Sequence, residues 1–177
     1  MQLPLVPHPA TPPAAPEFKV WANVDYAAAF GVMATLNIWF GLVAPASRFR
    51  LREGREGRAD ELWKTTCFEA FLRADGEDAY REWNFAPSGQ WAAYDFTAYR
   101  EDMAKADVKD PFIRMEDNLT WWTFGATVAV PSEVNWRLGV SAVLEEMDGT
   151  MSYWALAHPP GDRPDFHHAD CFAARLA

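Results

Sequence analysis

Two glutamates and an asparagine in the stretch 61–100 have the types and spacing of a site for a polyhydroxylated ligand. Glu69 lies in the first of three alternating runs, and Glu82 and Asn84 lie in the second. Side chains alternate along a strand, so Glu69 shares a face with the nearby Trp63, and Glu82 shares a face with Asn84. An indole packs on the apolar C–H face of a sugar, while carboxylate and amide groups hydrogen-bond its hydroxyls. The alternative is an ordinary half-buried aromatic residue beside a solvated carboxylate.

Paired carboxylates also suit acid–base catalysis at a glycosidic bond, which needs two carboxyl groups across a cleft. Glu69, Glu82 and Asp95 are the available acids. Acidic residues are common on the wet face of a strand, so we expect surface carboxylates in a non-catalytic module. The sequence has no Ser or Cys nucleophile elbow, no phosphate-binding glycine loop and no H-E-x-x-H motif.

A non-covalent haem b would need one Met and one His on facing strands around an apolar cleft. The lack of a C-x-x-C-H motif excludes covalent haem attachment. The spacing singles out no pair among the available side chains, which are His158, His167, His168, Met33, Met115 and Met147. We therefore expect no cofactor. We also expect no metal site at His167 and His168, because adjacent residues of an extended chain point to opposite faces.

A β-rich scaffold must hold these residues together. The stretch 61–100 is typical of a three-stranded meander, with its strands separated by Asp75-Gly76 and by Pro87-Ser88-Gly89. The alternation predicts that Phe68 and Trp83 face the core. The opposite face of the meander is then expected to be the outward one and to carry the site.

Similar alternation predicts further strands, at about 17–24, 30–40, 111–117, 119–130, 135–146, 151–158 and 171–176, and a helical turn at 101–109. Many short strands with regular turn signals are typical of all-β proteins. We predict an antiparallel β-sandwich, jelly-roll or immunoglobulin-like, with about ten strands.

The chain of 177 residues suffices for one well-filled core and is too short for two ordinary domains. Residues 1–16 contain six prolines, which remove backbone donors. This segment is therefore predicted to be an extended arm without a regular element. The sandwich domain is expected to span 17–177.

Composition narrows the classes of partner. The net charge of −9 argues against nucleic acid and against anionic lipid, both of which are bound through Lys and Arg. No apolar run approaches the length of a membrane span, and the N-terminal segment lacks the features of a secretory signal. The cytoplasm is therefore the expected compartment. Cys67 and Cys171 show no metal-type spacing and are expected to be buried, reduced thiols.

Three segments carry a family resemblance: ELWKTTCFEAFL, YREWNFAPSG and DFHHADCFAARL. They resemble DOMON-like domains and family 9 carbohydrate-binding modules. That group shows a Trp shortly before an acidic strand, then a strand ending in an N-P-x-G-like turn, and a last segment of the form aromatic-x(5)-F-G-x-L. The likeness covers most of residues 17–177 and is strongest to a bacterial DOMON-like subgroup. It implies a β-sandwich, and in family 9 modules two aromatic rings sandwich a terminal sugar. DOMON domains also include haem-b cytochromes, so the resemblance makes non-covalent haem b the alternative cofactor.

Carried over residue by residue, the resemblance implies that Trp63 and Phe166 are the sandwiching rings and that Glu69 is the strand acid. Asn84 falls where those modules have a basic residue, and Arg163 falls near the place of an amide. Phe in place of Trp and Asn in place of Arg leave fewer contacts to hydroxyls. The predicted ligand is a small saccharide or glycan-like metabolite. Its predicted contacts are Trp63, Glu69, Glu82, Asn84, Arg163, Phe166 and His167.

Overall fold

Segments in which apolar and polar residues alternate form the strands of this chain. The computed structural model describes residues 1–15, 17–28 and 32–176, and this part of the chain contains thirteen strands and three 3-10 helices. The strands are β1 (Gln2–Pro7), β2 (Val20–Ala28), β3 (Met33–Leu42), β4 (Gly57–Arg58), β5 (Cys67–Ala74), β6 (Tyr80–Phe85), β7 (Gln90–Phe96), β8 (Ala104–Lys105), β9 (Phe112–Asp117), β10 (Trp122–Pro131), β11 (Trp136–Glu145), β12 (Met151–Ala155) and β13 (Ala174–Leu176).

The 3-10 helices are η1 (Ala46–Arg48), η2 (Leu62–Lys64) and η3 (Ala169–Cys171). Among the described residues no helix has the length and apolar character to cross a membrane. The predicted start of the second strand at Phe30 and the last proline of the predicted arm, Pro16, lie outside the described residues.

All thirteen strands belong to one curled sheet. Its order is β4-β7-β6-β5-β11-β12-β1-β2-β3-β10-β9, with β13 beside β11 and β8 beside β7. β1 joins the two halves, because Gln2–Leu5 pair with β2 whereas Val6 and Pro7 pair with β12. β4 runs parallel to β7, so the sheet is mixed. The all-β prediction is confirmed, and the purely antiparallel sandwich of about ten strands is corrected to a mixed, curled sheet.

The proline-rich segment contributes to this sheet, so the prediction that it holds no regular element is wrong for residues 2–7. Pro4 and Pro7 cannot donate a ladder hydrogen bond. β1, however, has one neighbouring strand at each point along its length. Each proline can therefore turn its nitrogen to the open side without losing a bond, which is where strands tolerate proline.

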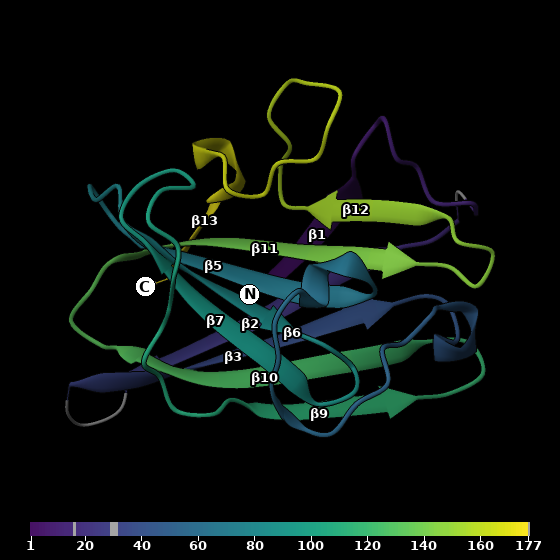
Figure 1. Ribbon diagram of the computed structural model, residues 1–177, viewed down its shortest axis with the longest axis horizontal. Coiled ribbons are helices and arrows are strands. Elements are labelled where there is room, and N and C mark those ends of the chain that lie inside the picture. Colours follow the sequence, from purple (N-terminus) through teal and green to yellow (C-terminus); the bar gives the residue numbers. More distant parts are fainter. Residues whose placement is uncertain (16, 29–31, 177) are drawn as a thin grey trace.

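The two halves of the sheet face each other across an aromatic core, and their strands cross in the view of Figure 1. Phe68 of β5 is fully buried at this contact, with its ring centroid 4.8 Å from Phe40 and 4.7 Å from Phe124. Trp122 lies 5.4 Å from the same ring. Trp83 belongs to the same core cluster. The predicted inward face of the meander is therefore confirmed.

The opposite face of β5 and β6 is covered as well, so the face predicted to be outward is not open to water. A second apolar cluster packs there, with Phe71 and Tyr94 from the strands and Leu62 from η2. Phe166 and Phe172 join it from the segment after β12, coloured yellow in Figure 1. The polar residues of this face consequently lie beneath a cover of loops.

Two short strands protect the free edge of β7. β4 pairs with it in parallel at Gln90 and Trp91, and β8 pairs with it antiparallel at Tyr94 and Asp95. The unpaired N–H and C=O groups of an edge strand readily bind an extended chain. This pairing makes β8 a strand, so the helical turn predicted over 101–109 is wrong.

Replacing Phe68 by Ala is expected to lower the free energy of unfolding by about 3–5 kcal/mol, because it opens a cavity between the two halves of the sheet. Urea titration followed by tryptophan fluorescence measures the loss. Phe112, which is 62% exposed, provides the matched control, since Phe112→Ala should change stability by less than about 0.5 kcal/mol. Equal losses in the two variants would show that Phe68 is not central to the core.

Candidate binding site

A cavity of about 370 Å³ lies between the covered face of the sheet and the loops above it. Its floor comes from β5, β6, β11 and β12, and its walls come from η2, the end of β7 and the segments after β7 and β12. The lining residues are Trp63, Glu69, Phe71, Glu82, Phe96, Arg100, Met103, Val143, Tyr153, Pro164, Phe166 and His167. A mostly apolar and aromatic lining with a few converging polar groups is typical of a small-molecule site.

Glu69 lies on β5 in the floor of the cavity and is 3% exposed. The register places Ser141 of β11 opposite it, and the Ser141 hydroxyl donates to Glu69 Oε2 at 2.7 Å. Burial, followed by the neighbouring Glu82 carboxylate, raises the pKa of Glu69 to about 8. The hydrogen bond from Ser141 and the charge of Arg100 oppose this rise without cancelling it. Glu69 is therefore largely protonated at neutral pH.

Glu82 lies on β6, diagonal to Glu69, because Asn84 is the residue directly opposite Glu69. It is 5% exposed, and the Asn84 amide donates to its Oε1 at 2.5 Å. Burial raises the pKa of Glu82 to about 7, although the Asn84 hydrogen bond and the charge of Arg100 lower it. The two acids interact, so near neutral pH the pair holds one to two protons between them.

His167 faces Glu82 from the loop after β12, with its Nε2 at 3.6 Å from Glu82 Oε2. The backbone N–H of Arg100 donates to the Tyr80 hydroxyl, which lies 2.6 Å from His167 Nδ1. Burial, with a smaller effect of Arg100, lowers the pKa of His167 to about 4, so the ring is neutral at neutral pH. The Tyr80 hydroxyl can then donate to Nδ1, which leaves the ring proton on Nε2, toward Glu82.

Arg100 is the permanent cation among the described residues that line the cavity. Its guanidinium donates to Asp165 Oδ1 at 2.8 Å, and the Tyr99 hydroxyl donates to Asp165 Oδ2 at 2.6 Å. Asp165 thereby ties the chain after β7 to the loop after β12, which carries His167. Sequence reasoning missed Arg100, since a single Arg after a strand has neither a period nor a motif to mark it.

The structure brings five of the seven predicted contacts to this one cavity: Trp63, Glu69, Glu82, Phe166 and His167. The local structure of Trp63 differs from the prediction, because Trp63 belongs to η2 and β5 begins only at Cys67. Its indole is held edge-on against the Tyr94 ring, with 6.1 Å between the centroids. Trp63 therefore reaches the same cavity as Glu69 from a wall rather than from the strand face.

The other two predicted contacts lie elsewhere. Asn84 is fully buried and serves to orient Glu82 rather than to line the cavity. Arg163 is exposed and borders a separate surface depression next to Pro160 and Asp162. It lies in a loop that the neighbouring Asp165 anchors to Arg100, so the loop reaches the site while the Arg163 side chain does not.

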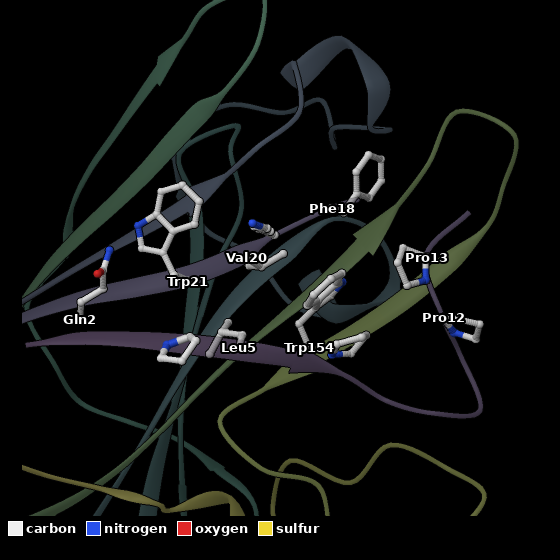
Figure 2. A pocket seen from close by; sticks show the side chains of 11 residues that line it. Gln2, Leu5, Pro12, Pro13, Phe18, Val20, Trp21 and Trp154 are labelled. Carbon is white, nitrogen blue, oxygen red and sulfur yellow. The ribbon is translucent and has the colours of Figure 1, made fainter. Parts of the chain in front are cut away.

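A larger hollow of about 630 Å³ lies where β1 leaves β2 and turns toward β12. Figure 2 shows Leu5, Val20, Trp154, Pro12 and Pro13 among the residues that line this hollow. Lys19, an exposed residue, is the one charged side chain among the described residues that line it. No buried polar or charged residue that could orient a ligand is among the described residues that line this hollow.

The Met residues considered as haem ligands do not line the cavity. Met33, Met115 and Met147 are exposed on the surface, at 43%, 39% and 59%. His167 lines the cavity, but its two ring nitrogens face Tyr80 and Glu82. His167 and His168 lie in a turn before η3 and not in the extended chain assumed from the sequence, and His168 Nδ1 accepts from the backbone N–H of residue 170. In the described ranges no three His, Cys, Asp or Glu side chains are placed to hold a metal ion.

The raised pKa values of Glu69 and Glu82 predict that stability falls as the pH rises from about 6.5 to 8. In this range the folded protein binds more protons than the unfolded chain, so the free energy of unfolding decreases with pH. His167 contributes in the opposite direction only below about pH 6.5, the ordinary pKa of histidine.

Urea titrations at fixed ionic strength measure this dependence. Glu69→Gln should flatten the decrease, and Glu116→Gln, an exposed change on β9, should leave it as in the wild type. A wild-type stability that is constant or rises over this interval would contradict the assignment.

No known protein family matches the chain, and neither does any curated protein. Among solved structures, the chain is similar to a protein from Bacteroides uniformis to which carbohydrate binding has been attributed. The TM-score is 0.64 and the identity 15%, over 97% of this chain and 83% of the other. At this identity the likeness establishes a shared fold.

Proposed function

We propose that this protein is a non-catalytic binding module for a small saccharide or a glycan-like metabolite. The observation that carries the proposal is a single cavity whose lining combines Trp63 and Phe166 with Glu69 and Glu82. Its volume of about 370 Å³ suits a small ring, since sites for organic ligands begin at about 300 Å³. Aromatic rings pack on the C–H faces of a sugar, and carboxyl groups hydrogen-bond its hydroxyls.

The protonation of the two acids fits a ligand that offers both donors and acceptors. A protonated carboxyl group donates one hydrogen bond and accepts others, whereas an ionised one only accepts. Glu69, with its raised pKa, can therefore meet a hydroxyl group in either orientation. Glu82 has one oxygen engaged by Asn84 and directs the other toward His167.

The placement of the acids favours binding over hydrolysis. Glycosidases hold two carboxyl groups on either side of the scissile bond, one as acid and the other as base or nucleophile. Glu69 and Glu82 instead come from the same face of two adjacent strands, so they form one floor. A sugar lying on that floor would meet both acids from one side.

The shared fold supports the proposed ligand, and the state of the cysteines supports the proposed compartment. The Bacteroides uniformis protein, to which carbohydrate binding is attributed, has the same fold. The cysteines Cys67 and Cys171 are free and buried, which suits a reducing compartment such as the cytoplasm. The resemblance to family 9 modules points to the same class of ligand.

Binding of a saccharide should change the tryptophan fluorescence of the wild type, because Trp63 lines the cavity. Trp63→Ala should abolish this response and weaken binding at least tenfold, a loss of about 1.4 kcal/mol or more. Trp121, which is 41% exposed in the turn before β10, is the matched control, and Trp121→Ala should keep the response.

The measurement is a titration with a panel of mono- and disaccharides that includes amino sugars. If no sugar alters the wild-type spectrum, or if Trp63→Ala responds like the wild type, the proposed function is wrong. Turnover of an aryl glycoside by the wild type would likewise contradict the non-catalytic role.

A further inference from the structure

The buried acids Glu69 and Glu82 have neutral partners. Ser141 donates a hydroxyl hydrogen bond to Glu69, and Asn84 donates an amide hydrogen bond to Glu82. The other oxygen of Glu69 has no hydrogen-bond partner among the described residues, although the side chain is 3% exposed and lines the cavity. His167, which faces Glu82, is neutral near pH 7 because its pKa is lowered to about 4. Neither carboxyl group therefore has an ion-pair partner in contact.

The cation of the cavity is engaged elsewhere. Arg100 directs its guanidinium to Asp165, at 2.8 Å, and Asp165 also accepts the hydrogen bond from Tyr99. Its charge lowers the pKa of both Glu69 and Glu82, but more weakly than burial raises these values. Arg100 and Asp165 neutralise each other, so the floor of the cavity lacks a compensating positive charge.

The walls suit an organic cation better than a metal ion. A calcium ion takes 6–8 oxygen ligands, whereas the groups around Glu69 and Glu82 are mainly rings. Trp63, Phe71 and Phe166 line the same space, with Phe96 and Tyr153 beside them. Aromatic rings attract ammonium groups through their negative faces, and the attraction grows where water is excluded.

We propose that the ligand of this cavity carries a protonated amino group, as an amino sugar does, and that the ammonium lies against Glu69 and Glu82 on the floor. This inference rests on the proposed function and names the saccharide class within it. The ammonium supplies three donors, enough for the unpartnered oxygen of Glu69 and for a carboxylate oxygen of Glu82. The remaining ring of the ligand packs between the aromatic walls.

The same placement accounts for the protons that the pair retains. Without a ligand, burial and mutual repulsion keep a proton on the acids near neutral pH. A bound ammonium supplies the missing positive charge, so both carboxyl groups can ionise beneath it. The hydrogen bonds from Ser141 and Asn84 are already oriented to the carboxylate oxygens and need not move.

Calorimetric titration of the full chain with three sugars that share one ring tests the inference. D-Glucosamine, N-acetyl-D-glucosamine and D-glucose present an ammonium, a neutral amide and a hydroxyl at the same carbon. We expect glucosamine to bind at least about tenfold more tightly than the other two. In Glu69→Gln and in Glu82→Gln, which keep the side-chain shape, this preference should fall to about threefold or less. Glu116→Gln should retain it.

A fourth compound separates the two proposals. The amine trans-4-aminocyclohexanol has an ammonium on a six-membered carbon ring but is not a sugar. If neutral sugars bind as tightly as glucosamine, the ammonium inference is overturned and the saccharide function stands. If the cyclohexane amine binds as well as glucosamine while neutral sugars do not bind, the cation site is supported and the saccharide function is wrong. If none of the four binds, both proposals are overturned.

Discussion

β5 is buried on both faces, and much of the structure follows from this constraint. Six consecutive residues, Cys67–Leu72, are buried, so the strand needs cover on either side. On the inner face, Phe68 packs against the opposite half of the sheet, so the sheet must curl. β1 connects the two halves of the curled sheet, because it pairs first with β2 and then with β12. The outer face requires loops, which η2 and the segment after β12 supply. Glu69 occupies that outer face, so an acid that would be solvated on an ordinary sheet lies in a cavity.

The loops over the outer face of β5 are held in place by hydrogen bonds and an ion pair that they form with one another. Asp165 binds both the Arg100 guanidinium and the Tyr99 hydroxyl, and Tyr80 receives the Arg100 backbone N–H and contacts His167. These contacts join the end of the meander to a loop about 65 residues further along the chain. The opposite charges of Arg100 and Asp165 neutralise each other. The acids on the floor are therefore left with neutral partners, which explains why burial dominates their pKa values.

Period-two alternation predicted the positions of most strands and the inward face of the meander, because those depend on local geometry. It failed for Trp63, which lies in η2. It placed Phe68 in the core and Glu69 on the opposite face, whereas the register that sets Asn84 opposite Glu69 is seen only in the structure. Alternation cannot say whether the second face of a strand is wet, since that depends on segments distant in sequence. The role of Arg100 was not predicted from the sequence for the same reason, because it depends on a partner in another loop. β1 was not predicted because its prolines lack the N–H donors of an ordinary strand. A strand that pairs with one neighbour at a time tolerates them.

Stability alone does not explain two acids on the floor of a cavity. Replacing buried ionic groups with apolar residues of similar volume is often neutral or stabilising, so a purely structural floor would favour apolar residues. Here Glu69 and Glu82 each receive one neutral hydrogen bond, from Ser141 and Asn84, and both residues line the cavity. A buried polar group with unused capacity is unfavourable in the unliganded protein. A bound molecule that completed these contacts would make the arrangement favourable, and this difference is why we propose that the cavity binds a ligand.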